Sequence, residues 1–330
     1  MPEIRVDPLT GLRVIIAGDR AGRPGGGMSC EPPAPIDAEQ DPFAEGHEDR
    51  TPPEVFAVRE TSPATAPDTP GWKVRVVPNL YPALDPGAPD PDPDAYPDLF
   101  TAAPARGEHE VVINAPQSVV SLSQLEPAQV STALGVWGER IRHHVEAGAS
   151  YVHVIVNERR EGGASLPHTH AQVYALPFVP AQIARERERF GAYATRTMGG
   201  NLLGDLVQEE VRRRERLVAV DDEAVLLAPY ASRLPYQLML APRRPSPRFE
   251  DDAPAGAALL HDALTRLARR FGSPPPLNLW VRTAPPGADH FGWRIDIQPR
   301  LTNLAGLELG AGIHLNVVAP EQAAAELRDT

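Results

Sequence analysis

The residues with the clearest capacity for chemistry are His168, His170 and Gln172 in the run HTHAQ. Side chains two residues apart lie on one face of a β-strand, so the three are expected to line up on one side of an extended segment. A neutral imidazole is a competent nucleophile toward phosphorus, and the phosphoramidate that it forms can pass its phosphoryl group to an acceptor. The amide N–H of Gln172 can donate to a phosphoryl oxygen as negative charge builds up in the transition state. The pattern therefore predicts group transfer through His170, in the middle of the row.

An isolated His-x-His on a strand is more often a pair of half-buried histidines bound to backbone groups, so the surrounding sequence decides between the two interpretations. That sequence reads NERREGGASLPHTHAQVYALPFVP. Its asparagine, glycine-rich turn, serine and His-x-His-x-Gln make it similar to the active-site segment of the galactose-1-phosphate uridylyltransferase family, within the histidine-triad superfamily. The resemblance implies that His170 is the nucleophile, that Gln172 stabilises the phosphoryl group and that His168 is part of the catalytic row. It also implies phosphate-binding positions for Asn157, Gly163 and Ser165.

Four further pieces look like the same family, so the resemblance spans nearly the whole chain: DPLTGLRVIIAGDRAGRP, VVPNLYPAL, EVVINAP, and PRLTNLAGLELGAG with PEQAAAELR. In the first piece Arg20 and Arg23 match arginines that reach phosphates from the neighbouring subunit, which implies a homodimer. In the second, Asn79 matches a residue near the nucleoside, and Leu80 and Tyr81 help to form the base pocket. Without the resemblance, the arginines would be solvated surface residues and Asn79 a turn residue after a strand.

The sequence departs from the family where many members bind a structural zinc ion. Asp41-Pro42-Phe43-Ala44 stands in place of a Cys-Pro-x-Cys pair, and Ser118 stands in place of a histidine ligand. Only His168 of that ligand set remains, and a lone imidazole does not hold zinc, which takes four nitrogen or sulfur ligands. We therefore predict that no zinc binds at this site.

A second metal site, for iron, uses one glutamate and several histidines in some members. Glu186 fits the glutamate, but Asp296 and Gln298 stand where histidines would be expected. This site is predicted to be empty, or to be replaced by hydrogen bonds that involve Arg294. The sequence therefore predicts no metal and no other cofactor.

The composition limits the classes of protein to which the chain can belong. The 330 residues, 42% of them hydrophobic, can bury a sizeable core and favour two domains. The net charge of −12 argues against broad binding to nucleic-acid backbones. There is no run of 18 apolar residues and no signal-peptide pattern at the N-terminus, so a cytoplasmic protein without membrane insertion is expected. Cys30 is the only cysteine, which excludes an internal disulfide.

The order of predicted elements indicates an α+β fold. Short β-rich runs at residues 54–59, 72–77 and 108–114 precede one amphipathic helix, whose start we place at a capping box of Ser123 and Glu126. Two strands follow, at 151–160 and 168–177, and the second half of the chain repeats the order. We predict two tandem histidine-triad-like domains from an internal duplication, each a mainly antiparallel sheet with a packed helix. The first, residues 1–179, is the catalytic domain, and the second, residues 180–330, lacks the nucleophile because Arg294, Asp296 and Gln298 occupy the places of the catalytic row.

The function implied is that of a nucleotidyltransferase, which moves a nucleoside monophosphate between a nucleotide sugar and a sugar 1-phosphate through a nucleotidyl-His170 adduct. One alternative is phosphorolysis or hydrolysis of a nucleotide sugar or a dinucleoside polyphosphate through the same adduct. Another is a non-catalytic member that binds nucleotides or a protein partner. The segment AGLELGAGIHLN lacks the lysine and tyrosine that uridylyltransferases use there, and it looks nearer to the ADP-glucose phosphorylase-like members. The base and the sugar therefore remain open.

Overall fold

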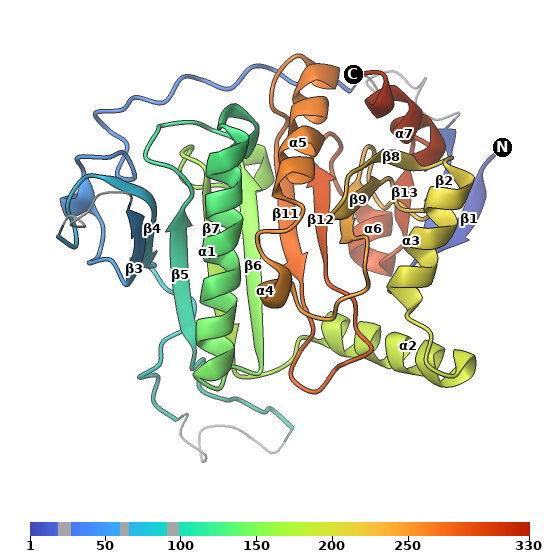
Figure 1. Cartoon of the computed structure of the whole chain (residues 1–330), viewed down its shortest axis with the longest axis horizontal. Helices are drawn as coiled ribbons and strands as arrows, with labels where there is room; N and C mark the ends of the chain where they lie inside the picture. The colour runs from blue at the N-terminus through green and yellow to red at the C-terminus, as the bar shows by residue number, and fades with distance from the viewer. Residues whose placement is uncertain (19–27, 60–65, 91–98) are drawn as a thin grey trace.

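The centre of the molecule is one ten-stranded sheet (Figure 1), seen in a computed structural model that describes residues 1–18, 28–59, 66–90 and 99–330. The strand order is β3-β4-β5-β7-β6-β11-β12-β10-β9-β8, and neighbouring strands are antiparallel throughout. The strands of this sheet are β3 (Phe56–Arg59), β4 (Trp72–Pro78), β5 (Glu108–Ile113), β6 (Tyr151–Glu158), β7 (His170–Leu176), β8 (Leu217–Val220), β9 (Ala224–Leu227), β10 (Leu238–Pro242), β11 (Leu277–Arg282) and β12 (Arg294–Pro299).

Each half of the sheet has the same order of elements along the chain. The first half runs β3-β4-β5, then helix α1 (Pro127–Glu146), then β6-β7, and the second runs β8-β9-β10, then α5 (Ala257–Phe271), then β11-β12. A short helix, α4 (Phe249–Asp252), precedes α5. Strands β6 and β11 pair at the centre, so the halves share one continuous sheet and do not form separate ones. The α+β class is confirmed, whereas the duplication and the division at residue 179 stay predictions.

Helices α1 and α5 lie side by side on one face of the sheet (Figure 1). On α1 the buried apolar side chains recur at helical spacing, as the sequence predicted: Val130, Leu134, Trp137 and Ile141. On the strands every second residue faces the helices, for example the valines at 152, 154 and 156 of β6. The alternate residues of β6 and β7 therefore face away from the helices, toward the side where the candidate site lies.

The prediction of a capping box at the start of α1 is wrong, because the capping box belongs to a short helix that precedes α1. Glu126 is the N-cap of α1 but makes no capping bond with its side chain, and Pro127 opens the helix. The reciprocal bonds are made instead by Ser121 and Gln124 around a 3₁₀ helix, η3 (Leu122–Gln124). Both pairs have the same three-residue spacing, so spacing alone could not separate them.

On the opposite face of the sheet, helices and a small second sheet lie over the second half. Helices α2 (Ala181–Thr197) and α3 (Leu202–Arg213) cover β9 and β10, and Phe190, Leu203 and Val207 form their apolar contact with the sheet. The N-terminal strands β1 (Glu3–Val6) and β2 (Arg13–Ile16) form a small sheet with β13 (His314–Asn316), so the two ends of the chain pair with each other. The remaining helices are α6 (Gly306–Ala311), α7 (Pro320–Arg328), η2 (Glu48–Arg50) and η4 (Arg160–Gly162). Among the described residues, no helix is long and apolar enough to cross a membrane.

Glu158, the last residue of β6, supplies a testable pH effect because its carboxyl group points into the core. Burial raises the pKa of Glu158 to about 7, although the backbone N–H of Leu122 donates to it at 2.8 Å. An acid whose pKa is raised on folding stabilises the fold below its ordinary value of 4.5, and that contribution is lost as pH rises through about 7. Glu158→Gln keeps the acceptor without the charge. It should be more stable than the wild type at pH 8 by ~2–4 kcal/mol, and equal to it at pH 4, in urea unfolding. The same difference in unfolding free energy between the variant and the wild type at both pH values would contradict this prediction.

Candidate functional site

A cavity of ≈ 350 Å³ opens on the uncovered face of the first half. Its floor is formed by His170 and Gln172 of β7 and by Val111 of β5, which pairs with Gln172 across the two strands. The loop after β4 and the turn before β7 supply its rim, together with a loop from the N-terminal part of the chain: Asn79, Leu80, Tyr81, Ser165, Leu166 and Phe43. The site therefore joins four regions that are separated in the sequence, at residues 42–52, 77–81, 111 and 165–172.

His170 is held in a single orientation at the beginning of β7. Its Nδ1 lies 2.8 Å from the backbone oxygen of His168, and because a carbonyl can only accept, Nδ1 carries a proton. Burial lowers the pKa of His170, which keeps the ring neutral near pH 7 and leaves the lone pair on Nε2. The ring of Phe43 meets the imidazole edge to face at 5.3 Å between centroids. Only 5% of the residue is exposed, yet it lines the cavity, so Nε2 is available to a bound phosphorus.

His168 lies just before the strand and does not line this cavity. Its Nδ1 is 2.7 Å from Oδ2 of Asp41, and its Nε2 is 2.8 Å from the backbone oxygen of Ala115. Ser118 donates to the same Oδ2 at 2.6 Å. Burial alone would raise the pKa of Asp41, but the bonds from His168 and Ser118 outweigh it and lower that pKa. His168 is thus fixed by an ionised carboxylate. Because the carbonyl group of His168 accepts from Nδ1 of His170, this also helps to fix the orientation of His170.

Asn157 is on β6, one strand away from His170 of β7, on the face of the sheet that is turned toward the site. Asn278 of β11 is its partner in the strand register, and the Nδ2 of Asn278 donates to Oδ1 of Asn157 at 2.8 Å. The same Nδ2 donates to the backbone oxygen of Gly162 at 2.5 Å. The carbonyl end of Asn157 is therefore occupied by the amide of Asn278.

The other predicted binding residues lie around the mouth of the site. Ser165 is exposed and lines both this cavity and a neighbouring one of ≈ 690 Å³. Gly163 has a φ of +93°, which favours glycine at this turn. Leu80 and Tyr81 are 61% and 85% exposed, so an apolar rim stands open to solvent. Arg20 and Arg23 lie outside the described residues.

Comparison with known proteins decides the family. A model of the "Galactose-1-phosphate uridyl transferase, N-terminal domain" matches residues 1–180, and a family of unknown function matches residues 132–329. The chain belongs to the galactose-1-phosphate uridylyltransferase family. An ADP-glucose phosphorylase from Arabidopsis thaliana is 29% identical over 99% of this chain and 93% of its own length. A galactose-1-phosphate uridylyltransferase from Rattus norvegicus is 32% identical over 76% of this chain and 69% of its own length.

Solved structures of this family share the fold over the full chain. The crystal structure of an ADP-glucose phosphorylase from Arabidopsis thaliana with bound ADP-glucose superposes with a TM-score of 0.81 at 28% identity, covering 100% of this chain and 99% of the other. A uridylyltransferase structure gives a TM-score of 0.75 at 26% identity, covering 100% and 98%. The likeness therefore extends over both halves of the sheet.

The zinc set of the family does not fit the residues found here. Asp41, Ser118 and His168 bind one another directly, and both nitrogens of the imidazole are occupied by protein groups. A zinc ligand needs a free nitrogen lone pair, so this arrangement is a hydrogen-bond network in its own right. Among the residues that the structure describes, no group of three or more His, Cys, Asp or Glu side chains is placed to hold a metal ion.

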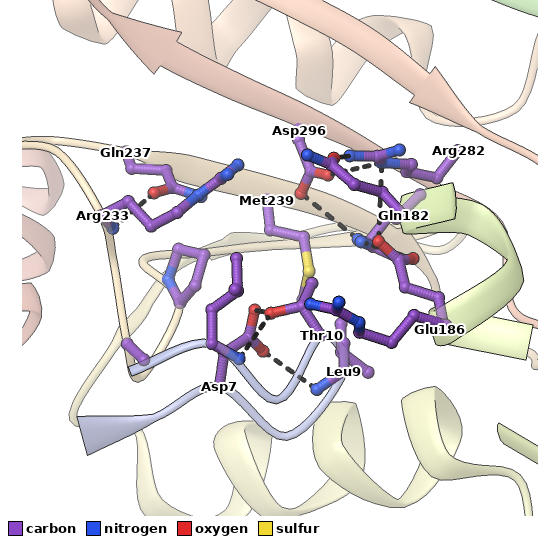
Figure 2. A pocket seen from close by; sticks show the side chains of 15 residues that line it. Asp7, Leu9, Thr10, Gln182, Glu186, Arg233, Gln237, Met239, Arg282 and Asp296 are labelled. Atoms are coloured by element: carbon purple, nitrogen blue, oxygen red, sulfur yellow. Dashed lines mark hydrogen bonds and ion pairs between the residues drawn. The ribbon is translucent and has the colours of Figure 1, made fainter. Parts of the chain in front are cut away.

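Glu186 and Asp296, which the sequence analysis compared with a second metal site, line a charged cavity of ≈ 80 Å³ under the N-terminal loop (Figure 2). Glu186 reaches into it from α2, and Arg282 and Asp296 reach in from β11 and β12. Arg294 is the cationic centre of this cluster: its Nη2 is 3.0 Å from Glu186, and its Nε is 3.3 Å from Asp296. Burial would lower the pKa of Arg294, but Asp296 and Glu186 outweigh this and raise it. The network joins α2 to the sheet by ion pairs, and Arg294 takes part in it as the sequence suggested, whereas the loss of a metal site stays a prediction.

Five residues of the site region were not identified as functional from the sequence: Phe43, Asp41 as a partner of His168, Asn278, His109 and Tyr174. Asn278 comes from the other half of the chain, and only the β6–β11 register brings it to the site. Asp41 could have been found, because an acid in place of a thiolate opposite a retained histidine suggests an ion pair.

Proposed function

We propose that the protein is a nucleotidyltransferase that acts on a nucleoside-diphosphate sugar through a covalent nucleotidyl-His170 intermediate. The observation that carries this proposal is the buried, neutral imidazole at the cavity floor, whose Nδ1 is engaged by the carbonyl of His168. Such a ring presents an unprotonated Nε2 without a separate general base. The amide of Gln172 lies beside it on the same strand face.

In the first step Nε2 of His170 forms a bond to the α-phosphorus, and the bond from that phosphorus to the bridging oxygen breaks. The sugar 1-phosphate leaves with the electron pair, and the ring takes on positive charge that the bond from Nδ1 to the His168 carbonyl stabilises. In the second step a phosphate oxygen of the acceptor attacks the α-phosphorus, and the nitrogen–phosphorus bond breaks. The imidazole is then neutral again, and no proton has entered or left Nε2.

Two acceptors fit this chemistry. A sugar 1-phosphate would yield a new nucleotide sugar, as in a uridylyltransferase, and inorganic phosphate would yield a nucleoside diphosphate, as in a phosphorylase. The match to an ADP-glucose phosphorylase over 99% of this chain favours phosphate as the acceptor and ADP-glucose as the donor. Hydrolysis of a nucleotide sugar and cleavage of a dinucleoside polyphosphate would pass through the same adduct.

The test is to incubate the protein with ADP-glucose, UDP-glucose or UDP-galactose in the absence of an acceptor and to measure its intact mass. We expect an increase by one nucleoside monophosphate with the true donor, as an adduct that is stable to base and labile to acid. Adding phosphate or a sugar 1-phosphate should then remove the adduct and release the corresponding product. Nucleotide binding without any adduct, for every donor, would favour the non-catalytic alternative and contradict the proposal.

Three structural expectations belong to the same proposal. The matching order of elements in the two halves supports an internal duplication, with a catalytic domain in residues 1–179 and a second domain in residues 180–330. Arg20 and Arg23 would reach the phosphates from a partner subunit, which requires a homodimer. Light scattering tests whether the protein is a dimer. A second test mixes subunits that carry Arg20→Ala with subunits that carry His170→Ala. If the arginines act across the interface, the mixture should regain part of the activity.

A further inference from the structure

We propose that His109 and Tyr174 are positioning residues, which hold the amide of Gln172 so that its N–H groups face the transferred phosphoryl group. This proposal rests on the proposed function. Neither residue lines the cavity, and no sequence motif connects either one with the site. Tyr174 would act on the reaction through Gln172, whereas His109 also accepts the backbone N–H of Ala83 in the loop that carries Asn79.

Both residues donate to the same oxygen atom. The hydroxyl group of Tyr174 is 2.7 Å from Oε1 of Gln172, and Nε2 of His109 is 3.1 Å from it. The strand geometry produces this convergence, because Gln172 and Tyr174 are two apart on β7 and His109 pairs with Tyr174 from β5. The rings of His109 and Tyr174 also stack, with centroids 4.0 Å apart and planes inclined by 24°. The two donors are therefore held rigidly with respect to each other.

A backbone N–H group shows which ring nitrogen of His109 carries the proton. The N–H of Ala83 points at Nδ1 at 3.0 Å, and since a backbone N–H can only donate, Nδ1 is the acceptor. Burial lowers the pKa of His109, so the ring is neutral and its one proton is on Nε2, which donates to Gln172. The Nδ2 of Asn79 lies 3.1 Å from the same Nε2 but does not donate to it in this tautomer.

The orientation of Gln172 follows from these two bonds. A carbonyl oxygen has two lone pairs, and here each has a donor, so the oxygen end of the amide is fully occupied. Rotating the amide by half a turn would place its N–H groups against the Nε2–H of His109, donor against donor. The amide is thus locked with its N–H groups on the side of the cavity and of His170. A donor fixed before the reaction costs no reorganisation in the transition state.

The test is a double-mutant cycle between Tyr174→Phe and Gln172→Ala, which are measured for kcat, KM and adduct formation. Tyr174→Phe keeps the stacked ring and removes only the donor, so kcat should fall by about 10-fold with KM within about twofold of the wild type. In the Gln172→Ala background the same change should have no further effect on kcat. His109→Phe removes Nε2–H and should also lower kcat, but it leaves the N–H of Ala83 without its acceptor, so Tyr174→Phe is the variant that decides.

The matched control is Tyr193→Phe, which removes a hydroxyl group that donates to Asp205 at 2.7 Å on the exposed side of α2. It should leave kcat unchanged. If Tyr174→Phe also leaves kcat unchanged, or lowers it equally with and without Gln172, the positioning role is wrong while the proposed function stands. If the wild type forms no nucleotidyl adduct, the proposed function fails, and the role proposed for His109 and Tyr174 fails with it.

Discussion

Replacing His170 with alanine is expected to lower kcat for nucleotidyl transfer by on the order of 10⁴-fold or more and to abolish the covalent adduct. The reason is that the buried imidazole is the only group on the cavity floor with an available nitrogen lone pair, among the residues described. A neighbouring amide or hydroxyl group cannot replace it, because neither forms a phosphoramidate that can be cleaved again. The measurement is steady-state turnover of the preferred nucleotide sugar, together with the intact mass of the protein after incubation with that donor.

The control for His170→Ala is His143→Ala, since His143 is exposed near the end of α1 on the far side of the sheet. That variant should keep both the adduct and the wild-type kcat. Nucleotide binding by His170→Ala should remain within about tenfold of the wild type, because the side chain contributes mainly to the covalent step. An adduct of normal yield in His170→Ala would place the nucleophile elsewhere and would overturn the mechanism.

The part of the site that sequence could predict is the part that lies on one strand. His170 and Gln172 are two residues apart, and a period of two fixes their common face without any knowledge of the fold. The sequence also indicated that His168 would share this row, but the strand begins only at His170, and His168 binds Asp41 in the loop region outside the cavity. Side chains alternate between the two faces only within the strand. His170 and Gln172 therefore share a face, and His168 supports His170 from the preceding loop.

Two of the partners that orient these groups, His109 and Asn278, could not be predicted, because each reaches the site through long-range strand pairing. His109 precedes Gln172 by 63 positions, and Asn278 follows Asn157 by 121. The register of neighbouring strands determines both contacts, and a shift of one residue would turn His109 or Asn278 to the other face. For the same reason the pairing of β1 and β2 with β13 was not predicted, since these strands are only three or four residues long.

Asp41→Ala is expected to destabilise the protein by ~3–5 kcal/mol, because it leaves the buried His168 without its carboxylate partner. The side chains of His168 and Asp41 are 0% and 1% exposed, so water cannot compensate for the loss. The measurement is the free energy of unfolding in urea at pH 7. Glu139→Ala, which breaks an ion pair with Arg142 that is nearly half exposed on both sides, is the control and should cost less than about 0.5 kcal/mol.

The same network predicts a loss of activity that a purely structural ion pair would not produce. His168 accepts the Nδ1–H of His170 through its carbonyl group, so freeing His168 allows the nucleophile to turn or to exchange its tautomer. Asp41→Asn keeps the volume of the side chain and removes the charge, and at a temperature where it is fully folded its kcat should fall by about 10- to 100-fold with little change in KM. Because the pKa of Asp41 is lowered on folding, the wild type should lose this stabilisation as pH falls below about 4, whereas Asp41→Asn should not. A folded Asp41→Asn with wild-type kcat would show that His170 is oriented without the carboxylate.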